Sequence, residues 1–487
     1  MTNYNRPTQN NVHKFFLVEP KMKLQWLDEP ELSFANGQTH TNPKVGIPLF
    51  GPKSLNTPRH KSQVHVGFVG EPDAIEKVKR FILECSKGVM AEDIENGSLS
   101  FPGISTEQGF KFEIIFSDAL VQKITTSEKD RITQNSNMDS QFVDTLNLIE
   151  EKVNILCEQD HPLDYIFIVL TEDVYNNIRV VKTLDPFSGK GRVPRNFRRA
   201  LKARLMKYNK PTQIIRDSTT GYTSDERNLQ DLATRAWNIL TGMYFKVGGL
   251  PWGPTDLQPA SCFVGISFFH PFGEPSYMRA SIAQAFNEHG DGLVLRGQKF
   301  KWDDELGKSP HLSQNLAQQL VTEVLNRYQV ECRQSPRRVI IYKSSRFEPD
   351  EREGFKKALT GASEYDLVTV GTTGNFRLFR SGEYPPLRGT VMNVGDNYFL
   401  YTTGYIPEIK KYPHGHVPAP LRIVDHYGDT SKNQLLKELF VLTKMNWNTA
   451  NVDGAFPITL QFARLVGEIL KEFPENETPN PKYIYYM

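Results

Sequence analysis

The chain has 487 residues, which is enough for roughly two to four domains of about 150 residues each. Its 58 Lys and Arg residues almost balance its 56 Asp and Glu residues. The formal net charge of +2 therefore excludes a globally basic nucleic-acid coat protein, and a site for a polyanion must be a local patch.

Four isolated cysteines without a Cys-x-x-Cys pair argue against a disulfide framework or a zinc ribbon, and they fit a reducing compartment. The polar start lacks the apolar core of a signal peptide, and no apolar run approaches the roughly 20 residues that span a bilayer. We therefore expect a cytoplasmic protein.

Residues 1–60 are predicted to form an extended N-terminal segment that lies on a domain. Within it, NPKVGIPLFGPKS at 42–54 holds too many Pro and Gly residues for regular structure. From residue 61 onward, short apolar runs that predict strands alternate with segments that show helical periodicity. Strands are expected at 64–70, 110–116, 165–171 and 212–215, and helices at 72–88, 142–156 and 228–246. This alternation predicts an α/β domain over 61–255 with a mainly parallel sheet covered on both faces.

The stretch RNFRRALKARLMKYNKPTQII at 195–215 contains seven cations and no acid. Apolar residues recur beside the cations at helical spacing, which predicts an amphipathic helix that Lys210-Pro211 ends. Arg198 and Lys202 lie on one face of this helix, about one turn apart. Together with Gln213 on the next strand they suit a terminal phosphate at the strand ends of the sheet. A solvated basic helix surface is the commoner explanation of such a run.

The helix at 228–246 ends at Lys246, before the Gly248-Gly249 stop, and a lysine there also offsets the helix dipole. We place a domain boundary near residue 255 and expect a second α/β domain over 256–487. Its strands are expected at 261–270, within 278–300, and at 337–345, 365–372, 397–406 and 418–426, and its helices at 312–329, 352–359, 433–447 and 457–473.

Several of these segments, in order, resemble the MID and PIWI domains of a short prokaryotic Argonaute, a type without N and PAZ domains. KVGGLPW at 246–252 is similar to the family's MID–PIWI junction, and FVGISFF, VIIYKSSRF, YTTGY, PAPLRI and FPITLQFARLVGEIL are similar to successive PIWI elements. The resemblance covers residues 190–487 well and the earlier part more loosely. It implies an α/β fold with a Rossmann-like MID domain followed by an RNase H-like PIWI domain.

The resemblance also implies a pocket for the 5′-phosphate of a guide strand, expected to be a small RNA. The family has an aromatic or basic residue, a Lys four residues later, a Gln on the next strand and a Lys before Gly-Gly. These positions fall on Arg198, Lys202, Gln213 and Lys246, and we expect both lysines to face solvent. Family members commonly add a Mg²⁺ ion that bridges the phosphate and the C-terminal carboxylate, which here belongs to Met487.

Slicing members of the family hold two metal ions with a carboxylate tetrad, because Mg²⁺ needs anionic oxygen ligands. At three tetrad positions this chain has Ser267, Ser344 and Arg464. Serine is a poor neutral ligand, and Arg464 puts a cation where a metal ion would bind. The resemblance therefore implies a PIWI domain without slicing activity, and we expect a protein that is not an enzyme.

A binder of this type would act through nucleic-acid pairing and a partner. Lys343, Arg346 and Arg422 are expected to contact guide and target backbones, while base pairing supplies specificity for complementary single-stranded DNA. Short Argonautes resemble sensors that pair with a separate APAZ-containing chain fused to a TIR, sirtuin-like or nuclease effector. Residues 1–60 and the PIWI face are the expected docking surfaces, and the implied activity is defence against plasmids or phage.

Two alternatives stay open. A guide-directed, metal-dependent nuclease with a displaced ligand set would use Asp303, Asp304, Glu348 or Asp350, although these are more commonly solvated loop acids. A two-domain protein that binds a small anionic metabolite would use the basic helix as its site.

Overall fold

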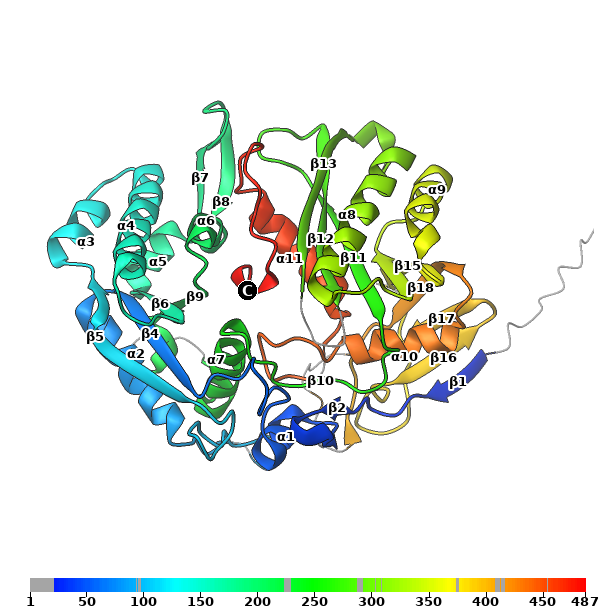
Figure 1. The fold of residues 1–487 in the computed structure, drawn as a ribbon, viewed down its shortest axis with the longest axis horizontal. Coiled ribbons are helices and arrows are strands. Elements are labelled where there is room, and N and C mark those ends of the chain that lie inside the picture. Colours follow the sequence, from blue (N-terminus) through cyan, green and yellow to red (C-terminus); the bar gives the residue numbers. More distant parts are fainter. Residues whose placement is uncertain are drawn as a thin grey trace, which may run out of the picture.

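The computed structural model describes residues 22–92, 94, 98–222, 229–286, 292–302, 304–307, 309–373, 376–407, 412, 417–452 and 454–487. Figure 1 shows two sheets of unequal size, each with its own helices, and the C-terminal end of the chain between them. Among the described residues, no helix is long and apolar enough to cross a membrane.

The smaller sheet is entirely parallel, in the order β5-β4-β6-β9. Its strands are β4 (Gln63–Gly70), β5 (Glu113–Lys123), β6 (Tyr165–Leu170) and β9 (Thr212–Arg216), and around it lie α2 (Pro72–Ser86), α3 (Thr126–Thr133), α4 (Met138–Glu158), α5 (Glu172–Ile178), α6 (Phe197–Leu205) and α7 (Leu232–Lys246). All of β6 is buried. Tyr165 and Phe167 belong to the core that includes α2 and α7, whereas Ile166 and Ile168 belong to the core that includes α4 and α6. The predicted sheet with two covered faces is confirmed.

The larger sheet has nine strands in the order β1-β16-β17-β18-β15-β14-β11-β12-β13. Its strands are β1 (Met22–Trp26), β11 (Ser261–Phe269), β12 (Tyr277–Phe286), β13 (Val294–Lys301), β14 (Arg338–Lys343), β15 (Glu364–Thr372), β16 (Thr390–Val394), β17 (Asn397–Leu400) and β18 (Leu421–Gly428), and its helices are α8 (Gln314–Cys332), α9 (Pro349–Ala358), α10 (Lys432–Leu442) and α11 (Ile458–Leu470). The central strands β11, β14 and β15 are parallel, and the other pairings are antiparallel. Alternate residues of β11 contact opposite faces: Val264 and Ile266 share a core with α8 and α9, while Gly265 lies against the backbone of α11. This mixed sheet confirms the predicted second α/β unit.

The N-terminal segment is more regular than the sequence indicated. Strand β1 pairs with β16 at one edge of the larger sheet, and β2 (Leu32–Ser33), β3 (Thr39–His40) and β10 (Gly253–Pro254) form a small sheet. The prediction that 42–54 has no regular structure is wrong, because α1 spans Pro43–Phe50. Pro43 stands in the first turn of α1, where its missing N–H costs nothing, and the side chain of Asn42 accepts a hydrogen bond from the Lys44 N–H.

The segment between α5 and α6 also differs from the expectation. It forms a two-stranded hairpin of β7 (Val180–Leu184) and β8 (Arg192–Asn196), which the sequence analysis did not predict. The strand expected at 110–116 begins at Glu113 and continues to Lys123. In Figure 1 the hairpin projects beside α4 at the top of the molecule.

Candidate functional site

Three of the four residues assigned to a phosphate pocket surround one backbone carbonyl. Lys202, on α6, donates to the carbonyl oxygen of Thr212 at 2.5 Å and to its hydroxyl at 3.1 Å. Lys246, the last residue of α7, donates to the same carbonyl at 3.4 Å and to Oε1 of Gln213 at 2.5 Å. The structure therefore brings Lys202, Gln213 and Lys246 together, although they are far apart in sequence.

The position of β9 explains this geometry. Within the described part of the chain it is an edge strand whose only partner is β6, so the Thr212 carbonyl can accept hydrogen bonds from side chains instead of from a neighbouring strand. Gln213 is the second residue of β9 and pairs with Phe167 in β6. The site thus lies at the free edge of the sheet, near the amino end of β9. The expectation that it lies at the carboxyl ends of the strands is wrong.

The two lysines are buried, with 3% of Lys202 and 2% of Lys246 exposed. The expectation that both face solvent is therefore wrong. Burial lowers the pKa of Lys202 well below its usual value, and the nearby Lys246 and Arg198 lower it further. Burial and Arg198 lower the pKa of Lys246 to about 7. No described carboxylate forms an ion pair with either ammonium group, so neither lysine has a counter-ion among the described residues.

Arg198 completes the cluster from the same helix as Lys202. The residue is exposed, yet protein atoms around its head group lower the pKa of the guanidinium by desolvation. A guanidinium keeps its proton in proteins, so Arg198 remains a cation. Its influence on the pKa values of Lys202 and Lys246 shows that the three cations lie close together. Solvent reaches Arg198, which makes it the accessible member of the cluster.

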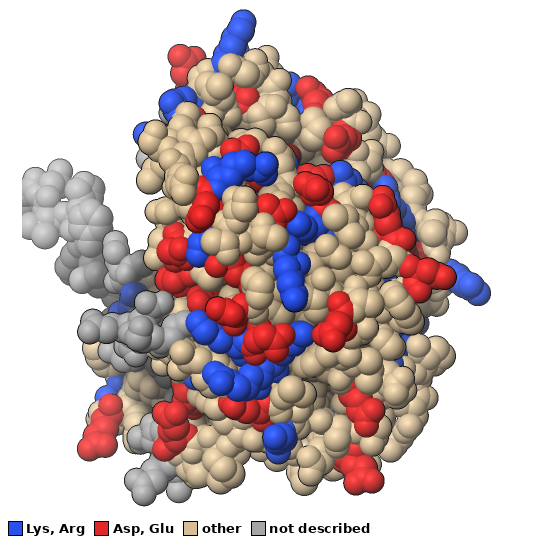
Figure 2. Space-filling model, turned by 90° about the vertical axis from the view of Figure 1, so that its left-hand side faces the viewer, with Lys and Arg blue, Asp and Glu red and all other residues tan. Residues whose placement is uncertain are grey.

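Most of the remaining cations in the basic stretch are engaged elsewhere. Arg195 pairs with Glu472 at 2.6 Å, and Arg199 pairs with Glu468 at 2.6 Å. Arg204 and Lys207 both pair with Glu150, and Lys210 donates to the carbonyl oxygen of Leu163. Figure 2, which views the molecule from the side of the smaller sheet, shows cations and acids interspersed over this face. The stretch is therefore not one uniform basic surface.

The end of the chain returns to this region. Figure 1 shows the C-terminal end between α6, β9 and α7 on one side and α11 on the other. Met487 is buried, and the ring of Tyr483 stacks on Phe462 with a centroid distance of 4.2 Å. Burial raises the pKa of Tyr483 well above its usual value, and Arg198 partly counters this, which places the tyrosine next to the cation cluster.

The side chains of this region and the C-terminal carboxylate can be compared with the ligands that Mg²⁺ requires. Among the described residues, no group of three or more His, Cys, Asp or Glu side chains could hold a metal ion. The Met487 carboxylate could supply one oxygen ligand. Mg²⁺ commonly takes its other ligands from phosphates and water, so the residues fit an ion that arrives with a phosphorylated ligand.

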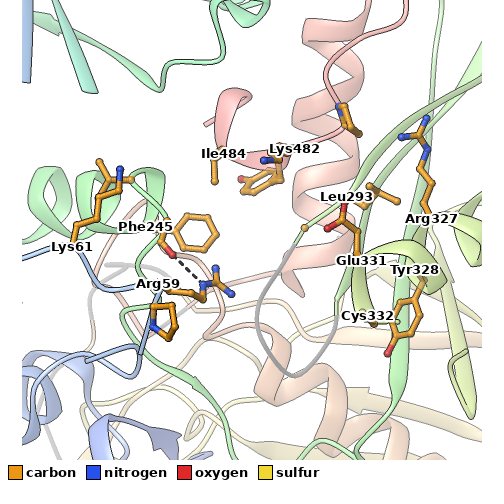
Figure 3. A pocket seen from close by; sticks show the side chains of 16 residues that line it. Arg59, Lys61, Phe245, Leu293, Arg327, Tyr328, Glu331, Cys332, Lys482 and Ile484 are labelled. Atoms are coloured by element: carbon orange, nitrogen blue, oxygen red, sulfur yellow. Dashed lines mark hydrogen bonds between the residues drawn. The ribbon is translucent and has the colours of Figure 1, made fainter. Parts of the chain in front are cut away.

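A cavity of about 490 Å³ adjoins the cluster and opens between the two units. Phe245 and Val247, which flank Lys246, line one part of it. Figure 3 shows Arg59 and Lys61 on one side, Arg327 and Glu331 on the opposite wall, and Lys482 between them. Arg59 Nε donates to the Gly248 carbonyl at 3.0 Å, next to the end of α7. Sequence analysis missed Arg59 because a lone cation in a Pro-rich segment carries no pattern.

The three positions at which the family resemblance implies a degenerate tetrad lie at the larger sheet and on the helix that packs against it. Ile266 of β11 pairs with Lys343 of β14 in parallel register. Ser267 and Ser344 follow these two residues, so they lie beside each other at the same edge. Ser267 is half-buried and Ser344 is exposed. Arg464 is exposed on α11, the helix that packs against β11.

The alternative metal ligands are only partly within the described residues. Asp303 lies outside them, and of Asp304 only the backbone is described, in the short helix Asp304–Leu306. Glu348 precedes α9, and Asp350 is exposed in its first turn. The described part of the chain therefore offers no cluster to support a displaced metal site.

Three residues were predicted to contact the guide and target backbones, and their surroundings differ. They are Lys343, Arg346 and Arg422. Lys343 is 0% exposed and forms an ion pair with Glu351, and its Nζ lies 4.6 Å from the centre of the Phe347 ring. Burial lowers its pKa, and Glu351 partly counters this. Because its charge is enclosed and paired, the prediction that Lys343 contacts a nucleic-acid backbone is wrong.

The other two members of that set remain accessible. The side chain of Arg346 is 69% exposed and makes only a loose ion pair with Asp425, at 3.7 Å. Arg422, on β18, is half-buried and donates to Asn397 at 2.6 Å. Its Nε is buried and has no hydrogen-bond partner among the described atoms. Arg346 and Arg422 therefore stay candidates for contacts with an anionic ligand.

Comparison with known proteins connects these features to one group. No protein-family model matches the chain. The Argonaute of Thermus thermophilus is 27% identical over 284 residues, which cover 56% of this chain and 36% of that protein. The structure of Clostridium butyricum Argonaute bound to a guide DNA and a 19-mer target DNA aligns with a TM-score of 0.63 and 17% identity, over 95% of this chain and 55% of the other. Drosophila Piwi aligns with a TM-score of 0.58 and 12% identity, over 95% and 56%.

These likenesses have clear limits. The chain spans about a third of the curated relative and about half of the solved structures. It is Argonaute/PIWI-like in sequence and fold, and its mixed α/β architecture matches that of the solved Argonaute structures.

Proposed function

We propose that this chain is the guide-binding subunit of a short Argonaute defence system. It would hold a 5′-phosphorylated small guide RNA and recognise complementary single-stranded DNA without cutting it. The observation that carries the proposal is the convergence of Arg198, Lys202 and Lys246 beside Gln213 without a described carboxylate in an ion pair with any of them. The Argonaute bound to guide and target DNA has the same fold, which supports a nucleic-acid ligand over a small metabolite.

The chemistry of anchoring follows from the hydrogen bonds of the two lysines. Lys202 and Lys246 now share the Thr212 carbonyl, and a terminal phosphate would give each ammonium group an anionic acceptor. The anion raises the pKa values of both lysines, so they bind it in the charged form. Arg198 can present its planar fork to the phosphate from the solvent side. A Mg²⁺ ion bound with the strand would neutralise further phosphate charge, with Met487 as its protein ligand.

The larger sheet would then support the pairing of the guide with the target strand and would not cleave the target. Ser267, Ser344 and Arg464 stand where slicing relatives hold carboxylates, which leaves no anionic oxygens for a pair of metal ions at those positions. Arg346 and Arg422 are the exposed and half-buried cations that could follow a phosphodiester backbone. Specificity would come from base pairing, and the protein would recognise backbone shape.

Such a binder needs an output, for which we propose an APAZ-containing effector subunit with a TIR, sirtuin-like or nuclease domain. Strand β1 ends the order of the nine-stranded sheet, and Met22, Leu24 and Trp26 are exposed along it. An apolar row beside a free strand edge suits strand addition by a partner chain. Target pairing would shift the complex toward an active effector state.

The direct test compares 5′-phosphorylated and 5′-hydroxyl forms of one small RNA by equilibrium binding. We expect tighter binding of the phosphorylated form, and Arg198→Ala should remove most of the difference. Arg204→Ala, on the same helix but paired with Glu150, is the matched control and should keep it. Equal binding of both RNA forms would refute the anchor.

A second assay separates the binder from a nuclease. Guide-loaded protein is incubated with a labelled complementary DNA strand in Mg²⁺ and in Mn²⁺. We expect an intact strand, and cleavage at a fixed distance from the guide end that Glu348→Gln abolishes would support the displaced metal site instead.

A further inference from the structure

The hairpin β7–β8 and its flanks form a strongly cationic segment outside the phosphate site. Residues 179–196 contain Arg179, Lys182, Lys190, Arg192 and Arg195, and the only acid is Asp185. This acid is buried, and its side chain accepts hydrogen bonds from the N–H groups of Phe187 and Ser188. The single negative charge of the hairpin is therefore turned inward.

The cations of this hairpin segment differ in their partners. Arg192 pairs with Asp139, and Arg195 pairs with Glu472. Arg179, Lys182 and Lys190 are exposed, and none of them forms an ion pair with a carboxylate in the described part of the chain. On α6 and in the turn after it, by contrast, Arg199, Arg204 and Lys207 all have carboxylate partners. Apart from Arg198, the exposed cations without a carboxylate partner in these two described segments thus lie upstream of α6.

The packing of β7 shows which way Lys182 points. Val181 and Thr183 are buried, and Val181 belongs to the core that includes α4. Val180, Lys182 and Leu184 alternate with them and are exposed, so they point away from α4. In Figure 1 the hairpin stands between α4 and the larger unit.

The hairpin is also held at both ends. At its base, Arg195 forms the buried ion pair with Glu472, just after α11. At its tip, Asp185 lies against the backbone of Gly273 in the loop between β11 and β12. Phe187 and Ser188 line a cavity of about 150 Å³ together with Gly273 and Lys471. A hairpin fixed in this way presents its cations at defined positions, which lowers the entropic cost of binding.

We propose that the β7–β8 hairpin is a second nucleic-acid contact, at which Lys182 and Lys190 bind phosphodiester groups of the strand anchored at the phosphate site or of its duplex with the target. The site rests on the proposed function for the identity of the ligand. Its chemistry needs only a polyanion that reaches the exposed face of the hairpin, since ammonium groups act on phosphates as point charges without base readout. Solvated lysines with no ligand are the ordinary alternative.

The test uses the double variant Lys182→Ala and Lys190→Ala in the full chain. The ligands are a 5′-phosphorylated RNA of guide length and the same RNA paired with complementary DNA, each titrated over a range of salt concentrations. Two lost phosphate contacts should lower the salt-dependence slope by about 1.4 for the single strand or about 1.8 for the duplex, and weaken binding about tenfold at low salt. A change with the duplex alone would assign the hairpin to the paired state.

Two controls make the outcome decisive. Lys207→Ala with Arg204→Ala removes the same charge from cations paired with Glu150, and it should leave the slope unchanged. Uridine 5′-monophosphate, which has no phosphodiester, should bind the hairpin variant as tightly as the unaltered chain. An unchanged slope for both RNA ligands overturns the proposal. Indifference of the unaltered chain to the 5′-phosphate would instead refute the anchor, and the slope comparison would still report on the hairpin.

Discussion

The smaller and the larger sheet each bury lysine side chains, but they treat the charge differently. Lys343, at the end of β14, lies against Glu351 and is 0% exposed. Lys202 and Lys246 are almost as deeply buried, yet their hydrogen-bond partners are the neutral Thr212 and Gln213. A buried lysine with an internal counter-ion completes the fold, whereas a buried pair without one leaves a binding opportunity at a cost in stability. This difference distinguishes the paired Lys343 from the unpaired Lys202 and Lys246, which the sequence pattern does not.

The largest effect is expected where the internal ion pair is broken. The Glu351 carboxylate accepts a hydrogen bond from the Leu312 N–H. Glu351→Gln keeps an oxygen that can accept this bond but removes the charge that faces Lys343. Leaving a buried ammonium group unpaired should destabilise the fold by about 3 kcal/mol, measured by urea unfolding. The control Glu150→Gln, at the partner of the exposed Lys207, should cost less than about 1 kcal/mol. If both changes cost the same, the contrast between paired and unpaired lysines fails.

The next effect concerns ligand affinity. Here the lysine of the smaller sheet should matter more than Lys343 of the larger sheet. Lys246→Met keeps the length of the side chain but removes its charge, and one charge-assisted hydrogen bond is worth about 1.5–3 kcal/mol. Affinity for 5′-phosphorylated RNA should therefore fall by roughly 10- to 100-fold, while the variant stays folded. Affinity for 5′-hydroxyl RNA should change little, which a filter-binding assay on the two RNAs measures. An equal loss with both RNAs would mean that Lys246 contacts something other than the terminal phosphate.

Much of the scaffold could be predicted because its elements have strong local patterns. The six apolar residues of β6 and the periodic segment that becomes α4 left little choice of structure. The hairpin β7–β8 was missed because the Asp185–Gly191 loop has the composition of an irregular connection. Helix α1 was missed because Pro43 and Pro48 lowered the expected helicity, although a proline in the first turn is favourable.

Arg198, Lys202, Gln213 and Lys246 were identified through the family resemblance. The burial of the two lysines could not be predicted from the sequence. It depends on where α7 ends relative to β9, which is a tertiary fact. The partner of Lys343 was equally hidden, since Glu351 is eight residues away and reaches it only because α9 folds back over the end of β14. Spacing along the sequence predicts contacts within a helix but not contacts between a strand and the helix after it.

The smallest effect is on stability in the absence of ligand, and it follows from the pKa of Lys246. Folding lowers this pKa from 10.5 to about 7, so between these pH values the unfolded chain binds more protons and the stability of the folded chain rises with pH. The penalty for burying the charge is complete below about pH 7 and disappears above pH 10.5. Lys246→Met removes the penalty but also the hydrogen bonds to Thr212 and Gln213, so its Tm should exceed that of the unaltered chain by only a few degrees at pH 6. Thermal melts at pH 6, 7.5 and 9 should show that the Tm difference between the variant and the unaltered chain shrinks as the pH rises.

The control is Lys207→Met, because Glu150 raises the pKa of Lys207; this variant should not show the trend. A Tm difference that is constant across these pH values would show that Lys246 is charged in the folded chain throughout, and that an unrecognised counter-ion already occupies the site.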